Sequence, residues 1–418
     1  MHLSNLGDLR DLSRDLNGCR LIAESFISHL QNTRNALNPW VCTNQDVDSL
    51  TLKLYENRNR PLSGLILGVK DVIATEEFPT KMGAGKNWEN PNMGFDARIV
   101  SEAKNLGVVV GGKTKSSEFA VHQETDVINP HYHGRTSGTS SSGSAAAVAS
   151  GSVCIALATQ TAGSIARPAS YCSVLAMKPT FGDYPRTGIL KTADEFDTVG
   201  FFGKSLSHIA EFYYTTRLKG MNYPVNEKRR NIKDFTSFIL AVGDNFDRAS
   251  NQLRNSVRKF ALKYVDKFST VDSPPNQFEI RAIHSSIYKE NLSYYFQQET
   301  KANRVSSDFS DFIESKQYTD QKIFREHLKQ LENWRAQFND FVGDSLIISL
   351  GANSSAPLKD PSYDFDMNLL ITAAGYSQIV VPNLIKDVDG KNVSISFSAR
   401  KGFDENLINF LSSNLALN

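Results

Sequence analysis

The serines on two glycine turns are the residues of this sequence best suited to catalysis. Residues 139–142 (Thr-Ser-Ser-Ser) precede Gly143-Ser144 and an alanine-rich stretch, which places them at the amino end of a predicted helix with unpaired backbone N–H groups. A second turn, residues 161–164 (Thr-Ala-Gly-Ser), follows the apolar run 153–158. Serines among fixed N–H donors suit acyl transfer, which needs an oxyanion hole, so we predict that both turns converge on one site.

The base that activates such a serine is less evident from the pattern. No G-x-S-x-G elbow surrounds Ser164, and the eight histidines show no motif that defines a Ser-His-Asp set. Lys70, in the sequence Gly-Val-Lys-Asp at the end of an apolar run, is the other candidate. Burial disfavours the ammonium form, and a neutral lysine accepts a proton. A Ser-Lys pair is therefore one interpretation, and a surface lysine with unrelated loop serines is the other.

The elements that must position these residues alternate between strand and helix. Apolar runs at 65–69 and 108–112 predict buried strands, and residues 97–105 predict a helix between them. Further strands are predicted at 153–158, 238–242, 346–350, 379–381 and 393–397. This order favours an α/β fold with one large, parallel or mixed central sheet and helices on both of its faces.

Helices are predicted on either side of that core. Residues 9–30 carry apolar side chains at helical spacing, with a break at Asn17-Gly18 and an end at Pro39. We predict one domain over residues 1–418, in which four parts follow each other along the chain. These are N-terminal helices (1–60), a core (61–206), a mostly helical block (207–345), and C-terminal strands with a final helix (346–418).

Composition excludes several other classes of protein. The 46 Lys and Arg against 45 Asp and Glu give a net charge of +1, which argues against nucleic-acid binding. Four scattered cysteines predict neither a disulfide framework nor a zinc site, and His122, His131 and His133 are expected on the surface without a metal. The charged N-terminal residues lack a signal-peptide core and no apolar run could span a bilayer, so we expect a cytoplasmic protein without membrane contact.

Residues 134–149 resemble the signature motif of the amidase signature family. They read GRTSGTSSSGSAAAVA, and the likeness continues through TQTAGSIARPA at 159–169 to MKPT at 177–180. Gly68 to Asp71 lies upstream, where the family has its catalytic lysine. The resemblance is good over 65–203 and poor over 219–343. It implies the amidase-signature fold, and some residues resemble the malonamidase-like subset.

The resemblance implies a role for each residue of the site. Ser164 would be the nucleophile, Ser140, on a cis peptide bond in the family, the proton relay, and Lys70 the base. The other implied positions support these three. They are the oxyanion-hole N–H groups of Thr161, Ala162, Gly163 and Ser164, the substrate-binding residues Gly138, Thr139 and Arg167, and Thr159 and Ser141 behind the relay.

Three positions beside these residues depart from the family's pattern. Ala162 stands where glycine is usual, and alanine tolerates a positive φ poorly, so the turn would be distorted if it needed that conformation. Ser137 replaces a common proline and Thr139 a common glycine. The three catalytic positions are intact, so an active enzyme is expected.

The implied activity is hydrolysis of a small-molecule carboxamide to a carboxylate and ammonia or an amine, through an acyl-enzyme and without a cofactor. Arg167 resembles the arginine with which malonamidase-like enzymes hold a substrate carboxylate, because its guanidinium suits that group; alternatively it ties its turn to the sheet. A homodimer is possible. Two other functions stay open: a non-catalytic binding or scaffold protein, and the ammonia-supplying subunit of an amidotransferase.

Overall fold

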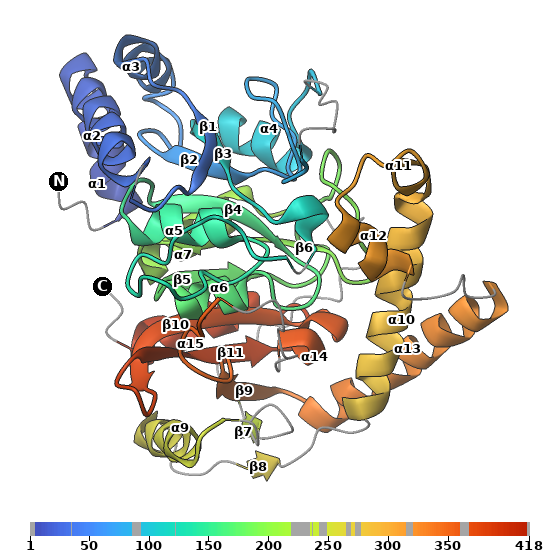
Figure 1. Cartoon of the computed structure of the whole chain (residues 1–418). Helices are drawn as coiled ribbons and strands as arrows, with labels where there is room; N and C mark the ends of the chain where they lie inside the picture. The colour runs from blue at the N-terminus through green and yellow to red at the C-terminus, as the bar shows by residue number, and fades with distance from the viewer. Residues whose placement is uncertain are drawn as a thin grey trace.

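A mixed eleven-stranded sheet runs through the chain in the order β1-β3-β2-β4-β6-β5-β10-β11-β9-β7-β8 (Figure 1). The computed structural model describes residues 5–34, 36–85, 93–121, 123–218, 235, 237–241, 249–264, 269–271, 277–314, 321–359 and 368–415. The strands are β1 (Trp40–Thr43), β2 (Ile66–Lys70), β3 (Val109–Thr114), β4 (Ile155–Gln160), β5 (Leu175–Lys178), β6 (Thr198–Gly203), β7 (Ser237–Ala241), β8 (Ser269–Val271), β9 (Ser345–Leu350), β10 (Ser377–Lys386) and β11 (Asn392–Ala399).

Parallel and antiparallel pairs are combined in this sheet. Strand β2 lies parallel to both β3 and β4, strand β7 is parallel to β8 and β9, and the strands from β4 to β9 pair antiparallel. Because β2 and β4 are parallel neighbours, with Val69 opposite Leu157, their carboxyl ends meet at one edge. Lys70 ends β2 and Gln160 ends β4 there. The sheet topology thus brings the lysine and the second glycine turn to the same place.

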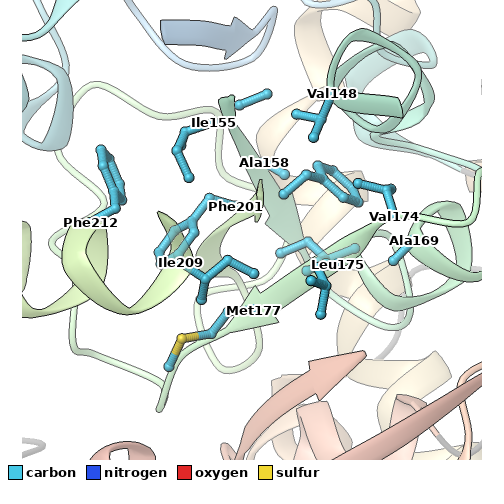
Figure 2. Packing of buried hydrophobic residues seen from close by; sticks show 14 of the residues in the cluster. Val148, Ile155, Ala158, Ala169, Val174, Leu175, Met177, Phe201, Ile209 and Phe212 are labelled. Carbon is cyan, nitrogen blue, oxygen red and sulfur yellow. The ribbon is translucent and has the colours of Figure 1, made fainter. Parts of the chain in front are cut away.

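Helices cover both faces of the sheet, as the sequence predicts. They are α1 (Leu6–Leu12), α2 (Leu16–Arg34), α3 (Val47–Glu56), α4 (Arg98–Asn105), the 3₁₀ turn η1 (Glu118–Ala120), α5 (Ser142–Ala149), α6 (Ala166–Tyr171), α7 (Leu206–Thr216), α9 (Asn251–Tyr264), α10 (Gln277–Tyr295), α11 (Gln297–Lys301), α12 (Ser307–Glu314), α13 (Gln321–Val342), α14 (Asn368–Ala373) and α15 (Asp404–Asn414). Figure 2 shows Phe212 of α7 on one side of the strands, and Val148 of α5 and Ala169 of α6 on the other. The α/β class with a mixed sheet is therefore confirmed.

The first helical segment differs from its prediction. The break between α1 and α2 lies at residues 13–15, not at Asn17-Gly18, and Gly18 is inside α2. Asp15 Oδ1 accepts the N–H of Gly18 at 2.8 Å, which caps the start of α2. A Cβ on Gly18 would lie 1.7 Å from the Leu12 carbonyl oxygen, so the glycine permits close packing of the two helices. Strands β1, β5 and β8 were not predicted because they have only three or four residues. Strand β6 has six residues, but its sequence shows no clear alternation.

A second cluster of buried side chains packs beside the sheet, where the helices α10 and α13 stand (Figure 1). Trp334 and Phe338 of α13 stack there at 4.8 Å, and Phe338 contacts Tyr376 at 5.4 Å. Phe196 and Ala162 belong to the same cluster. The helical block therefore packs directly against the turn at residues 161–164.

Candidate active site

Lys70 and Ser140 are in direct contact inside the protein. Lys70 Nζ donates to Ser140 Oγ at 2.8 Å and to Thr159 Oγ1 at 2.9 Å, and the lysine is 0% exposed. Burial lowers the pKa of Lys70 to about 7, against the opposing effect of the negative charge of Asp197. A large share of Lys70 is therefore neutral near pH 7, so its lone pair is available to accept a proton.

The loop around Ser140 is packed tightly against the start of α6. The Thr139–Ser140 peptide bond is cis, and Gly138 has a φ of 77°. A Cβ on Gly138 would lie 2.8 Å from Pro168 Cα, so only glycine allows this approach. On the other side, Ser141 Oγ donates to the Thr159 carbonyl oxygen at 3.2 Å. The serine loop is thus fixed between α6 and the end of β4.

The turn at residues 161–164 presents free donors. No hydrogen bond from these four backbone N–H groups is recorded within the described part of the chain, whereas the next two, of residues 165 and 166, donate to Gln160 Oε1 at 2.8 and 3.0 Å. Gln160 itself is held by Thr372, whose Oγ1 accepts from Gln160 Nε2 at 2.9 Å. The free N–H groups are what an oxyanion hole requires.

Ala162 is accommodated without distortion of that turn. Its φ is not positive, so the conformation that would favour glycine is not needed here. The residue is 6% exposed and its methyl group belongs to the cluster of the helical block. The distortion considered from the sequence is therefore absent, and alanine adds a packing contact that glycine would lack.

Thr161 is tied to a buried carboxylate that the sequence did not reveal. Thr161 Oγ1 donates to Asp197 Oδ1 at 2.6 Å, and Thr192 donates to the same carboxylate from its hydroxyl (2.6 Å) and its N–H (2.8 Å). Burial raises the pKa of Asp197, while these hydrogen bonds oppose the rise. Asp197 thus anchors the turn and lies close enough to Lys70 to influence its charge.

Ser164 is the last residue of this turn, just before α6, and it is 7% exposed. No hydrogen bond between Ser164 Oγ and either Ser140 or Lys70 is recorded among the described residues. The structure therefore places Lys70, Ser140 and Thr159 in one hydrogen-bonded group, with Ser164 on the adjoining turn.

Arg167 is buried in α6, three residues after Ser164. It is 3% exposed, and its NH1 donates to the Thr139 carbonyl oxygen at 3.5 Å. Burial raises the pKa of Glu124, and the positive charge of Arg167 is one of the smaller effects that oppose this rise. Arg167 therefore connects α6 to the residue before Ser140, rather than to the sheet, and brings a positive charge next to the loop that carries Ser140.

Two residues beyond the signature contact the 161–164 turn, and no sequence pattern indicated them. His284 of α10 donates from Nε2 to the Thr161 carbonyl oxygen at 2.9 Å, and Thr372 Oγ1 lies 2.7 Å from the Ala162 carbonyl oxygen. Helix α10 lies in the block that was predicted only as mostly helical, and α14 was not predicted. A side chain's contact with a turn more than 100 residues away leaves no mark in local periodicity.

The described residues hold no group of three or more His, Cys, Asp or Glu side chains that could bind a metal ion. His131 and His133 are exposed, and His122 lies outside the described residues. Of the helices with described positions, none is long and apolar enough to cross a membrane.

Comparisons with known proteins show the family and the fold of this chain. The profile of the Amidase family matches residues 22–237. A chloroplastic/mitochondrial glutamyl-tRNA(Gln) amidotransferase subunit of Arabidopsis thaliana is 31% identical over 238 residues, which cover 54% of this chain and 44% of that protein. The chain thus spans less than half the length of this curated relative.

Solved structures share the fold over nearly the whole chain. A crystal structure described as that of an amidase has a TM-score of 0.83 at 20% identity and covers 99% of this chain and 100% of its own. Native peptide amidase from Stenotrophomonas maltophilia has a TM-score of 0.78 at 19% identity, with coverage of 99% and 98%. With the family profile matching more than half of its residues, the chain belongs to the amidase family.

Proposed function

We propose that this protein is an amide hydrolase that uses Ser164 as nucleophile, Ser140 as proton relay and Lys70 as base. The observation that carries the proposal is the buried Lys70, bonded to Ser140 at 2.8 Å and with a pKa lowered to about 7, beside a turn with free N–H groups. A neutral amine, a relay hydroxyl and fixed oxyanion donors are the parts that acyl transfer needs. The substrate class is a small-molecule carboxamide.

The first half-reaction forms an acyl-enzyme. Ser164 Oγ attacks the amide carbon while its proton passes to Ser140 Oγ, and the proton of Ser140 passes to neutral Lys70. The carbonyl oxygen becomes an oxyanion among the N–H groups of residues 161–164. The C–N bond then breaks, and the leaving nitrogen takes the proton that Lys70 returns through Ser140. Ammonia or an amine departs.

The second half-reaction uses water in place of the serine. Water attacks the ester carbon and gives its proton to Lys70 through Ser140. The C–O bond to Ser164 breaks, Ser164 Oγ regains the proton, and the carboxylic acid leaves and ionises in solution. Labelling of Ser164 by a fluorophosphonate, followed by mass spectrometry, tests the first half. Release of many ammonia molecules per protein molecule from a primary amide tests the second, because each further turnover needs hydrolysis of the acyl-enzyme.

We propose further that Arg167 selects a substrate with a carboxylate. Its buried guanidinium lies beside the residue before Ser140, and a charge-assisted bond there would hold an anionic group. Succinamate and butyramide are matched amides that differ by a carboxylate in place of a methyl group. We expect the wild-type protein to have the higher kcat/KM for succinamate. In Arg167→Gln the ratio of kcat/KM for succinamate to that for butyramide should fall by about 10- to 100-fold, which corresponds to the loss of one charged hydrogen bond. Equal losses for both amides would show that Arg167 acts only through Thr139.

A second candidate function follows from the named relatives. The curated relative described above belongs to an amidotransferase, so this chain would release ammonia from glutamine for a partner. Glutamine added to the same amide panel separates the two candidates. Glutamine as the best substrate would favour the amidotransferase role, whereas folded wild-type protein without labelling or ammonia release would favour a non-catalytic scaffold.

A further inference from the structure

We propose that His284 is a positioning residue of the oxyanion hole, which holds the peptide between Thr161 and Ala162 so that its N–H faces the reacting carbonyl. This inference rests on the proposed function, since it concerns the turn that bears Ser164. His284 lies on α10, in the helical block and outside the residues that match the family profile. The block would therefore contribute to catalysis without touching the substrate.

The hydrogen bond of His284 defines its protonated nitrogen. Nε2 lies 2.9 Å from the Thr161 carbonyl oxygen, and a carbonyl oxygen only accepts, so Nε2 must carry the hydrogen. The other nitrogen, Nδ1, is buried and has no partner within the described chain. A second proton at Nδ1 would be buried without an acceptor. Burial accordingly lowers the pKa of His284 to about 4, so a neutral Nε2–H tautomer is present at neutral pH.

Packing fixes the ring in this position. His284 is 2% exposed, and its ring stacks on Phe196 with centroids 4.2 Å apart and planes 27° from parallel. Tyr288, one helical turn later on α10, lies 6.0 Å from the imidazole by ring centroids. Phe196 is adjacent in sequence to Asp197, which binds the side chain of Thr161. Both the carbonyl group and the side chain of Thr161 are therefore held by buried groups from two separate segments.

The carbonyl group of Thr161 and the N–H group of Ala162 belong to one planar peptide unit. A bond that fixes the carbonyl oxygen therefore fixes the direction of the N–H on the opposite side. It also polarises the peptide, which strengthens the N–H as a donor in a buried setting. Without His284 the peptide loses the bond to its carbonyl oxygen, and its N–H can turn from the direction that the oxyanion needs.

The two following peptides of the turn are held in the same way. Thr372 Oγ1 lies 2.7 Å from the Ala162 carbonyl oxygen and 2.7 Å from the Asn368 carbonyl oxygen. These two acceptors share the single proton of the Thr372 hydroxyl. The Gly163 carbonyl oxygen accepts the backbone N–H of Arg167 at 2.9 Å. The carbonyl groups of residues 161–163 thus each accept a hydrogen bond. The N–H groups of the same three peptide units, those of residues 162–164, have no recorded partner within the described chain. Removing the His284 side chain takes away one of these donors without altering a backbone group, so it is the clearest test.

The experiment measures the rate of fluorophosphonate labelling at Ser164 in three variants. His284→Phe keeps the ring and its stacking on Phe196 but removes the donor, and we expect a fall of about 10- to 100-fold, less than or similar to loss of a direct oxyanion donor. His284→Gln offers an amide N–H near the place of Nε2, and we expect a rate within about fivefold of wild type. His208→Phe is the matched control, because His208 is equally buried, has a pKa lowered to about 4, and bonds to Ser205 at the start of α7.

The pH profile of labelling separates positioning from general damage. The rate of labelling should rise with pH to a plateau, with a midpoint set by the pKa of the buried Lys70. His284→Phe is expected to lower the plateau rate and to leave the midpoint near pH 7, because Lys70 stays buried. A midpoint that moves toward the ordinary value for lysine would show that the site has opened to water, and it would overturn the proposal. So would a His284→Phe rate equal to that of wild type, or an equal fall in His208→Phe.

Folding of the variants and labelling of the wild-type protein decide the remaining outcomes. If His284→Phe does not fold, His284→Asn takes its place, since its shorter amide cannot span the distance to Thr161; equal labelling of the Asn and Gln variants would then contradict a positioning role. If wild-type protein is folded but Ser164 is not labelled, the proposed function fails first. Normal labelling of wild type with unchanged His284 variants overturns this inference alone.

Discussion

Ser164→Ala is expected to abolish labelling by a fluorophosphonate and to lower amide hydrolysis by about 10⁴- to 10⁶-fold, since no other group replaces a missing nucleophile. Ser164 occupies a turn with free N–H groups, directly before α6. The methyl side chain leaves the backbone donors and Lys70 in place. The residual rate of this variant would therefore report what the oxyanion hole supplies by itself.

Mass spectrometry of the labelled protein and ammonia release are the two measurements. Ser150→Ala is the control, because Ser150 follows α5 and its hydroxyl bonds only to Ala147 and Ser152 among the described residues; it should label at the wild-type rate. An adduct that persists in Ser164→Ala, or hydrolysis within about tenfold of wild type, would rule out Ser164 as the nucleophile.

Lys70→Met has the second large expected effect, a fall of about 10²- to 10⁴-fold in kcat/KM, the range of general-base catalysis. Methionine keeps the length and the apolar stem of the side chain but accepts no proton. In the wild-type protein the rate should rise with pH and level off above a midpoint near 7, because the ammonium form of Lys70 cannot act as a base. Below the midpoint, the rate should fall about tenfold for each pH unit.

A second buried lysine gives a matched control for this prediction. Burial lowers the pKa of Lys178 to about 7 as well, but its Nζ donates to the carbonyl oxygens of Pro179 and Tyr376 and not to a serine. In Lys178→Met, with activity compared per folded molecule, the midpoint of the pH dependence of kcat/KM should stay near pH 7. A Lys70→Met variant that loses less than tenfold, or that retains this midpoint, would contradict the assignment of the base.

The sequence determined the strands that carry the site and the order in which they follow each other. Apolar runs located β2, β3, β4, β9 and β11, and the glycine turns located residues 138–143 and 161–164. These features are local: a buried strand is an apolar run, and a turn that packs closely needs glycine, as Gly138 does against Pro168. The family resemblance was carried by these same segments and is confirmed by the match over 22–237.

The tertiary structure alone decided which groups meet. Lys70 and Ser140 are 70 positions apart. They touch because the loop that carries Ser140 is bonded through Ser141 to Thr159 in β4, and β4 lies beside β2. The pKa of Lys70 follows from burial by many segments together, which no local pattern encodes. His284 reaches Thr161 from a helix within the block predicted only as mostly helical, and Asp197 reaches it from a loop that no pattern indicated. Periodicity tells which face of an element is buried, but the partner of a buried polar atom is set by how distant elements pack.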